Sequence, residues 1–385
     1  MKISQMVKRE NFYLINERTL EKYFLQYINR NFTISTKKAT KHSDLYVFPN
    51  LNAIISKRTS PEIKNYLFTE YSVKGSIIRR MMVKLYLILC FKFPVLFSQF
   101  GINIDGSVDS LNFNDILVYP CNRKIRIFNF KTNTVDVIVK DGFSNESILN
   151  EIKVRSTVNE DFILPIINST DNLYREKIID GTPLARITSE KDYKRYLENT
   201  LECMRMLESS TRQDVHIVLY VNRLQKEIKS KLENNKLKSK IPTDVVDNVL
   251  KKLLENCLEY DGVISISLSH GDLQHGNVWI ENNTEKIYII DWESAKYRSV
   301  WYDRFLLMNG ARMDDNIFHL MQESNINDFY KFDDIHQISS RKSLASLIAL
   351  EDIDYRINET IDLPKDYGIS ELKTYFNSLL MFIGK

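Results

Sequence analysis

The sequence predicts an α+β protein with an antiparallel-sheet lobe, a mainly helical lobe and an extra N-terminal α/β module. Short β-like runs bounded by turn residues fill the middle of the chain. Broad apolar stripes at helical spacing follow, and a polar cluster comes shortly after an apolar strand. We place the module at residues 1–105, the sheet lobe at 106–183 and the helical lobe at 184–385.

The N-terminal module begins with a predicted helix over residues 17–27, whose apolar residues share one face. Residues 45–49 and 52–56 are short β-like runs. A basic helical region then leads into the most apolar run of the chain. The module therefore combines helices and short strands.

That run, residues 81–100, is broken by Lys84, Lys92 and Pro94. A membrane-spanning helix needs about 20 consecutive apolar residues, so we expect no spanning segment here. Two interpretations remain open. The simpler one is a buried helix or helix pair, and the other is a peripheral membrane contact with basic side chains near the headgroups.

Five strands are predicted for the sheet lobe, at residues 116–119, 124–130, 134–140, 165–168 and 174–179. A turn at residues 132–133 joins the second strand to the third. A helix whose N-terminus Ser144 can cap follows the third strand. This order gives an antiparallel sheet with one helix inserted after its third strand.

Five helices are predicted for the helical lobe, at residues 189–207, 214–232, 243–257, 343–349 and 370–383. The Lys-rich run at residues 226–240 lacks aromatic residues, so we interpret it as a solvated face rather than a nucleic-acid patch. An apolar strand at residues 263–267 separates the third helix from the polar cluster.

Charge and cysteine content exclude several function classes. The 53 Lys and Arg residues nearly balance the 50 Asp and Glu residues, so nucleic acid is not an expected partner. Cys90, Cys121, Cys203 and Cys257 lack metal-ligand spacing and suit free thiols in a reducing cytoplasm. Charged residues precede any apolar core at the N-terminus, which is untypical of a signal peptide. We expect a cytoplasmic location.

The polar cluster brings oxygen ligands together. Residues 269–277, the catalytic loop, read SHGDLQHGN, and a predicted hairpin then leads to residues 289–293, which read IIDWE. Asp272, Asn277 and Asp291 thus converge from two loops. Phosphoryl transfer from Mg-ATP needs a carboxylate for the proton of the attacking hydroxyl, and further oxygens for the metal. The spacing is of the protein-kinase type and predicts an ATP-dependent phosphotransferase.

The motif His-Gly-Asp-Leu-x-x-Gly-Asn followed by Ile-Asp-Trp-Glu resembles the aminoglycoside phosphotransferase and choline kinase branch of the protein kinase-like superfamily. The resemblance implies a kinase-like two-lobed fold, with ATP and Mg²⁺ as cofactors. It implies that Asp272 is the catalytic base and that Asn277 and Asp291 are magnesium ligands. It also implies that His270 braces the loop and that Glu293 supports the metal through water.

Asp303 has two interpretations. It falls where that family often has an aspartate that orders the catalytic loop, and it is equally an ordinary acidic residue of a helix N-terminus. The sequence does not decide between them.

The resemblance also implies a phosphate-binding lysine on the third strand of the sheet lobe, held by a glutamate on the next helix. We assign these roles to Lys140 and Glu151, with Lys131 and Glu146 as alternates.

A hinge-like run resembles the family's adenine contact and adds Glu176 and Ile178 to the predicted nucleotide-binding residues. The turn at residues 120–124 departs from the family pattern because it has no glycine, so its backbone cannot fold as closely over phosphates. We expect Arg123 or Lys124 to contact the phosphates through side chains instead.

The predicted function is phosphorylation of a hydroxyl group by Mg-ATP. The family implies a small alcohol as acceptor. The N-terminal module is similar in layout to kinase-like proteins of bacterial surface-polysaccharide clusters, which favours a saccharide or a lipid-linked glycan. Arg304, Arg312, Asp314 and Asp315 lie where an acceptor can be contacted. Two alternatives stay open: a non-catalytic kinase-like scaffold in a polysaccharide-synthesis complex, and a protein kinase.

Overall fold

The computed structural model describes residues 2–29, 31–72, 77–105, 112–310, 312, 338 and 340–383. The chain forms two compact units. Unit 1 comprises Met1–Ser156 and Leu164–Asp180, and unit 2 comprises Thr157–Ile163 and Gly181–Lys385. The division into residues 1–105, 106–183 and 184–385 stays a prediction.

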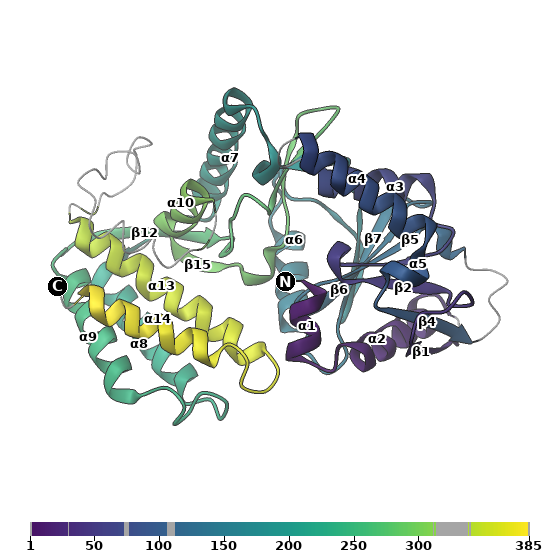
Figure 1. Ribbon diagram of the computed structural model, residues 1–385. Coiled ribbons are helices and arrows are strands. Elements are labelled where there is room, and N and C mark those ends of the chain that lie inside the picture. Colours follow the sequence, from purple (N-terminus) through teal and green to yellow (C-terminus); the bar gives the residue numbers. More distant parts are fainter. Residues whose placement is uncertain are drawn as a thin grey trace. The chain divides into compact units, whose positions relative to one another are not determined.

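A nine-stranded sheet, as far as the structure is described, forms the centre of unit 1, and all neighbouring strands run antiparallel (Figure 1). In order across the sheet, the strands are β1 (Thr33–Lys37), β4 (Phe100–Asp105), β2 (Leu45–Phe48), β3 (Ala53–Ser56), β5 (Ile116–Pro120), β6 (Lys124–Asn129), β7 (Thr134–Val139), β9 (Leu173–Lys177) and β8 (Ile166–Thr170). The sequence did not predict β1 and β4.

Strands of the predicted N-terminal module and of the predicted sheet lobe belong to this one sheet. The junction is the β3–β5 pair, in which Ile54 lies opposite Val118 and Ile55 opposite Leu117. All four side chains are buried. Because each fully buried aliphatic side chain stabilises the fold by about 1.5–3 kcal/mol, this junction belongs to the core of unit 1.

Helices cover both faces of the sheet (Figure 1). They are α1 (Ile3–Arg9), α2 (Phe12–Tyr27), α3 (Pro61–Ser72), α4 (Ile77–Lys92), α5 (Pro94–Phe97) and α6 (Glu146–Thr157). Ile138 of β7 packs in the core under α1 and α2, whereas its neighbour Val137 packs in the core under α3, α4 and α6. Because successive side chains of a strand point to opposite faces of the sheet, the core of unit 1 has two parts, one on each face.

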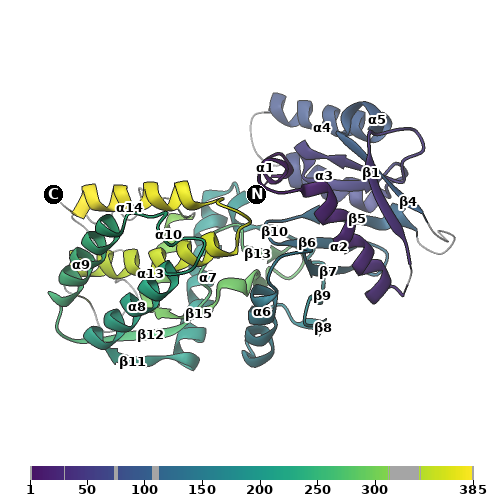
Figure 2. The ribbon, with the colours of Figure 1, turned by 90° about the horizontal axis from the view of Figure 1, so that it is seen from below.

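Unit 2 is mainly helical. Its elements are β10 (Gly181–Pro183), α7 (Glu190–Thr211), β11 (Gln213–His216), α8 (Ile217–Leu232), α9 (Thr243–Leu258), β12 (Val263–Ser269), β13 (Val278–Glu281), β14 (Ile287–Ile289), β15 (Lys296–Ser299), α10 (Val300–Asn309), α13 (Arg341–Asp362) and α14 (Ile369–Ile383). Helices α8, α9, α13 and α14 pack side by side around one apolar core (Figure 2). Two small sheets have the orders β10-β13-β14 and β11-β12-β15.

The α+β class, with an antiparallel sheet followed by a mainly helical part, is confirmed. Two helix predictions need correction. The helix predicted at residues 214–232 starts at Ile217, because the preceding residues pair with β12 as strand β11. The helix predicted at residues 343–349 continues to Asp362, since its acidic residues are buried with partners and do not end it.

The described residues bear on two further expectations, one about a membrane-spanning helix and one about the cysteines. No helix among the described residues is long and apolar enough to span a membrane. All four cysteines are free thiols. Cys90 and Cys257 are buried and Cys121 and Cys203 are partly buried.

Glu351 is a fully buried carboxyl group in the middle of α13. The Tyr220 hydroxyl donates to it at 2.5 Å, the Ser299 backbone N–H at 2.6 Å and the Ser299 hydroxyl at 2.7 Å. Burial raises the pKa of Glu351 to about 7, although these hydrogen bonds act in the opposite direction.

We expect Glu351 to make the stability of the protein depend on pH. Because its pKa rises from 4.5 to about 7 on folding, the folded state binds this proton more tightly than the unfolded chain. The stabilising contribution is complete below pH 4.5 and is lost as the pH rises to about 7. It amounts to about 3 kcal/mol of unfolding free energy.

Urea denaturation of the wild type and of Glu351→Gln across this range measures the effect. The stability of the wild type relative to the variant should fall as the pH rises. A difference that stays constant with pH contradicts the raised pKa.

Candidate active site

The catalytic loop begins where two paired strands of unit 2 meet. β12 ends at Ser269, and Lys296, the first residue of its partner β15, lies directly opposite Ser269. The pairing fixes the position from which residues 270–277 leave the sheet.

A hairpin brings Asn277 and Asp291 to the same place. Val278 at the start of β13 lies opposite Ile289 at the end of β14. One residue further out, the Ile290 backbone N–H donates to the Asn277 carbonyl at 3.0 Å. Asn277 and Asp291 therefore lie at the same end of the hairpin, as the sequence predicted.

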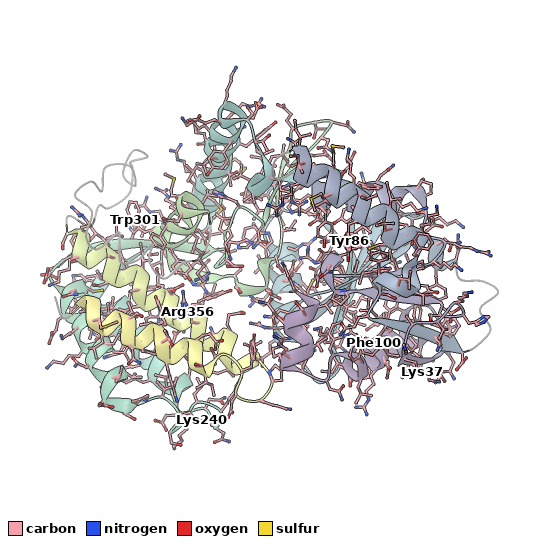
Figure 3. The ribbon with its side chains drawn as sticks, viewed as in Figure 1. Lys37, Tyr86, Phe100, Lys240, Trp301 and Arg356 are labelled. Carbon is pink, nitrogen blue, oxygen red and sulfur yellow. The ribbon has the colours of Figure 1, made fainter. Side chains whose placement is uncertain are left out.

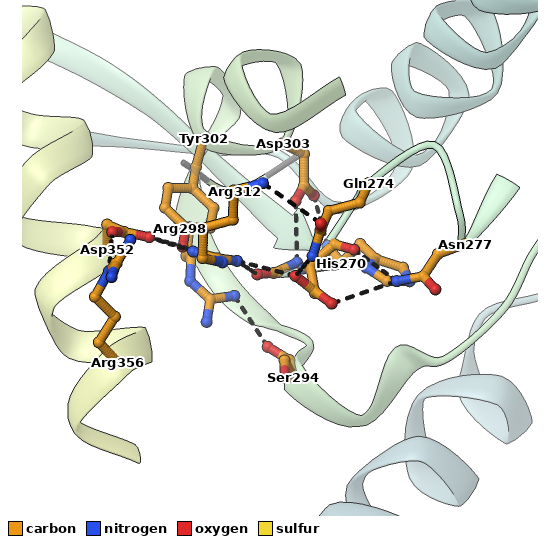
Figure 4. A network of polar contacts seen from close by, with 12 residues as sticks. His270, Gln274, Asn277, Ser294, Arg298, Tyr302, Asp303, Arg312, Asp352 and Arg356 are labelled. Atoms are coloured by element: carbon orange, nitrogen blue, oxygen red, sulfur yellow. Dashed lines mark hydrogen bonds and ion pairs between the residues drawn. The ribbon is translucent and has the colours of Figure 1, made fainter. Parts of the chain in front are cut away.

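Asp303 orders the start of the catalytic loop. Its carboxylate accepts the backbone N–H of His270 at 2.5 Å and that of Gly271 at 3.0 Å (Figure 4). Asp303 lies buried in the first turn of α10. Of the two interpretations of Asp303, the structure therefore supports loop ordering, because both carboxylate oxygens bind loop amides.

His270 ties the catalytic loop to the strand that leads to Asp291. The side chain is buried, and its Nδ1 accepts the Asp272 backbone N–H at 3.2 Å. Nε2 therefore carries the proton and donates to the Ile290 carbonyl at 2.9 Å. The ring packs edge-on against Trp292, with centroids 4.7 Å apart. With both ring nitrogens bonded to backbone, His270 has the geometry of a brace.

Three side chains hold the Asp272 carboxylate (Figure 4). Gln274 donates to Oδ1 at 2.6 Å, Arg312 donates to the same oxygen at 3.2 Å, and the Asn277 amide lies 3.4 Å from Oδ2. The Asp272 side chain is still 23% exposed. A carboxylate that is oriented by several donors and open to solvent suits proton transfer with a bound hydroxyl.

The residues present fit a magnesium ion. The Asn277 amide nitrogen also donates to the Asp272 backbone carbonyl at 2.8 Å, so the amide oxygen points away from Asp272 (Figure 4). Carboxylate and amide oxygens are the hard ligands that Mg²⁺ prefers. Asn277 and Asp291 can supply one of each at the same end of the hairpin.

Asp291 adopts left-handed backbone geometry, with φ 72° and ψ 52°, directly before the short helix η5 (Trp292–Ser294). Aspartate tolerates this geometry better than most other residues, and such strain is common at functional sites. Glu293 lies in η5 and stays a predicted ligand. Within the described ranges, no three His, Cys, Asp or Glu side chains are grouped to hold a metal.

Arg312 places a cation beside Asp272. It donates to the carbonyl of the residue before Asp272 at 2.7 Å and to the Tyr302 hydroxyl at 2.5 Å, and it forms an ion pair with Asp352. Its guanidinium stacks 3.5 Å from the Tyr355 ring centroid. Burial lowers the pKa of Arg312, but Tyr302 and Asp352 raise it more, so the pKa lies well above its ordinary value. Arg312 therefore stays charged.

The predicted pairing of Lys140 with Glu151 is wrong. Lys140 is buried and its ammonium donates to Glu10 at 2.7 Å. Lys140 follows Val139, which lies opposite Lys124 in the β6–β7 pair. Because successive residues of a strand point to opposite faces, Lys140 faces α1, whereas Lys124 faces α6.

Glu151 pairs with Lys124, at 3.3 Å, instead of Lys140. Arg155, one helical turn further on, donates to Glu151 at 3.1 Å and forms an ion pair with Glu176 at 2.8 Å. All four residues are buried. Burial raises the pKa of Glu176, whereas the charge of Arg155 lowers it. The predicted hinge residue Glu176 thus contributes its carboxylate to a buried charge cluster.

Two predicted nucleotide contacts remain. Arg123 lies in a turn at one end of the sheet, and Ile178 directly follows strand β9. Arg123 is buried in the β5–β6 turn, where the Cys121 N–H donates to the Lys124 carbonyl at 2.8 Å. This turn is too tight to form a loop over phosphates. The Ile178 backbone N–H donates to the Asn133 carbonyl at 3.1 Å, so that N–H already has a partner within unit 1.

Sequence reasoning missed the roles of Gln274 and Arg312. Gln274 lies inside the motif, and its position two residues after Asp272 was the available signal. Arg312 is 40 residues from Asp272 in sequence, and no local pattern marks it.

Of the other acceptor residues considered, Arg304 is the one that the structure describes, and it is not part of this site. Arg304 is buried and donates to Glu208 at 3.1 Å. Asp314 and Asp315 lie outside the described residues.

No protein-family model and no curated protein matches the sequence. Among solved structures, the chain is similar to an ethanolamine kinase from Plasmodium vivax, with 14% identity over 84% of this chain and 93% of that chain, at a TM-score of 0.39. A choline kinase from Cryptosporidium parvum shows 13% identity over 72% of this chain and 91% of that chain, at a TM-score of 0.41.

An ADP-bound aminoglycoside phosphotransferase shows 15% identity over 68% of this chain and 90% of that chain, at a TM-score of 0.40. All three are structures of kinases or phosphotransferases.

We expect Gly271→Ala to destabilise the protein, because Gly271 has φ +83° and an added Cβ would collide with the Ser294 carbonyl and the Arg298 guanidinium. Strain of this kind costs about 2 kcal/mol or more. Gly276→Ala is the matched control in the same loop, since nothing lies within 4 Å of its added Cβ. Thermal unfolding should show a lower Tm for Gly271→Ala only, and equal Tm values contradict the argument.

Proposed function

We propose that the protein is an ATP- and Mg-dependent phosphotransferase that phosphorylates a hydroxyl group of a small molecule or a saccharide. The orientation of Asn277 carries the proposal. Its amide nitrogen contacts Asp272, while its amide oxygen points away, at the hairpin end that also bears Asp291. Asn277 thereby contacts the proposed proton acceptor through its amide nitrogen and can bind the metal through its amide oxygen. Phosphoryl transfer to an alcohol requires both groups close together.

In this proposal Asp272 accepts or orients the proton of the acceptor hydroxyl while the hydroxyl oxygen attacks the γ-phosphoryl group of ATP. The bond from the γ-phosphorus to the bridging oxygen breaks, and ADP leaves. Gln274, Asn277 and Arg312 fix the direction of the Asp272 carboxylate. Such positioning lowers the barrier because little covalent chemistry is left for the protein to perform. Asp303 and His270 support the loop without touching the reactants.

Asn277 and Asp291 would hold Mg²⁺, with Glu293 as a supporting residue. When bound with ATP, Mg²⁺ neutralises charge that develops on the phosphate oxygens. In unit 1 we propose Lys124 in place of Lys140 as the phosphate contact, because Glu151 holds Lys124.

A saccharide or lipid-linked glycan is the acceptor that the layout of the N-terminal module favours, and a peripheral membrane contact of residues 81–100 would bring the enzyme to a lipid-linked acceptor. A protein substrate is less favoured. Gly271 stands where protein kinases usually have arginine, and Glu293 stands where they usually have glycine.

The tight, glycine-free turn between β5 and β6 favours a second candidate function. Without a flexible backbone loop, fewer N–H groups can bind phosphates. A non-catalytic scaffold that binds nucleotide weakly, or binds a partner enzyme, would tolerate this turn.

We expect Asp291→Asn to abolish both the Mg-dependent rise of Tm with ATP and Mg-dependent ATP turnover. Asparagine tolerates the left-handed backbone of Asp291, so the fold should be kept while the charged ligand is lost. Turnover should fall by at least about 100-fold. Asp261→Asn, whose side chain is 87% exposed, is the control.

Three outcomes distinguish the functions. Loss of the Mg-dependent Tm rise and of ATP turnover in Asp291→Asn, but not in Asp261→Asn, supports the enzyme function. A variant that turns over ATP at the wild-type rate contradicts the metal assignment. A wild type without any Mg-dependent Tm shift favours the scaffold.

We expect Arg312→Ala to lower kcat by about 100-fold with little change in KM for ATP, because the Asp272 carboxylate loses one orienting donor. Added guanidinium ion should restore part of kcat, which a purely structural role of Arg312 would not allow. Arg223→Ala, an exposed arginine, is the control. An unchanged kcat in folded Arg312→Ala contradicts the positioning role.

A further inference from the structure

The outward face of α4 is apolar. Six large apolar side chains of α4 are between 50% and 71% exposed, namely Ile77, Ile78, Met81, Met82, Leu85 and Ile88. On the short helix α5, Leu96 is 78% exposed. Together these seven side chains form what we call the α4 patch. Exposed apolar groups of this density mark interaction surfaces in soluble proteins.

The inner face of α4 is already used by the fold. Leu87 and Cys90 are fully buried in the core of unit 1. The hydroxyl of Tyr86, the residue of α4 that Figure 3 labels, accepts a hydrogen bond from Asn50 at 3.0 Å. At 100° per residue, Met81 and Leu85 lie on the opposite side of α4 from Leu87 and Cys90. The helix therefore has a second apolar face that the described residues do not cover, so the expectation of a buried helix or helix pair at residues 81–100 holds for one face of α4 only.

The charged residues of the segment that carries the α4 patch are all basic. The segment from Ile77 to Phe97 carries Arg79, Arg80, Lys84 and Lys92 and no acidic residue. Lys84 lies within one helical turn of Met81 and Leu85, and the Lys92 ammonium lies 5.6 Å from the Phe93 ring centroid. Long basic side chains can keep their charged ends in water while their stems lie on apolar surface.

We infer that the α4 patch docks on an anionic lipid surface. A helix with exposed large apolar side chains flanked by Lys and Arg is typical of segments that lie in the membrane interface. A symmetric contact between two copies through this patch would instead bring Lys84 and Lys92 of each copy together, and the segment offers no acidic residue to pair with them. Charge complementarity therefore favours anionic headgroups over a second copy.

Vesicle flotation of the full chain, without nucleotide, tests this inference separately from phosphoryl transfer. We expect the wild type to float with vesicles of phosphatidylcholine plus phosphatidylglycerol and not with phosphatidylcholine alone. Met82→Glu should reduce flotation by about tenfold or more, because it removes an apolar contact and adds a like charge. Lys84→Gln should reduce it less.

Matched controls separate the patch from general surface effects. Met381→Glu changes the same residue type at nearly the same exposure, 64% against 66% for Met82, and it should float like the wild type. Lys251→Gln is the corresponding control for Lys84, since the Lys251 side chain is 75% exposed.

Four results overturn the inference. They are absence of flotation of the wild type, equal flotation with both lipid compositions, equal loss in Met82→Glu and Met381→Glu, and a wild-type oligomer that Met82→Glu converts to a monomer. The last result would assign the α4 patch to self-association.

Discussion

The carboxylate of Asp303 holds a turn that only glycine can make, and the geometry of the candidate site depends on that turn. Both oxygens of Asp303 accept backbone N–H groups, from His270 and Gly271. Gly271 has left-handed backbone geometry, with φ +83°, and it separates two side chains that point in different directions. His270 turns inward and is fully buried, while Asp272 remains partly exposed to solvent.

Buried charges connect this loop to α13. Arg312 contacts Asp272 on one side and Asp352 on the other, and Arg356 also donates to Asp352, at 2.6 Å. Burial of a charge is costly unless the charge is paired. The pairing lowers the pKa of Asp352 to about 2, against the effect of its burial. This network explains why a helix in the core of unit 2 carries acidic residues.

In unit 1, the alternation of strand residues decides which lysine can serve a nucleotide. Lys124 and Lys140 lie at the same end of neighbouring strands, but they point to opposite faces of the sheet. Glu10 of the N-terminal segment neutralises Lys140 in the core beneath α1, and Glu151 of α6 pairs with Lys124. The N-terminal helices therefore change the electrostatics of the neighbouring strands, which a segment-by-segment interpretation could not anticipate.

Residues 269–277, the β13–β14 hairpin and most strands could be predicted from the sequence alone, because local spacing and turn chemistry encode them. Asp272, Asn277 and Asp291 were predicted as site residues for that reason. The partners of Lys140, Glu151 and Arg312 became visible only in the folded chain, since these contacts join residues from 27 to 130 positions apart. The tertiary structure also decided that the second apolar face of α4 points outward, because apolar composition alone cannot distinguish a buried face from an exposed one.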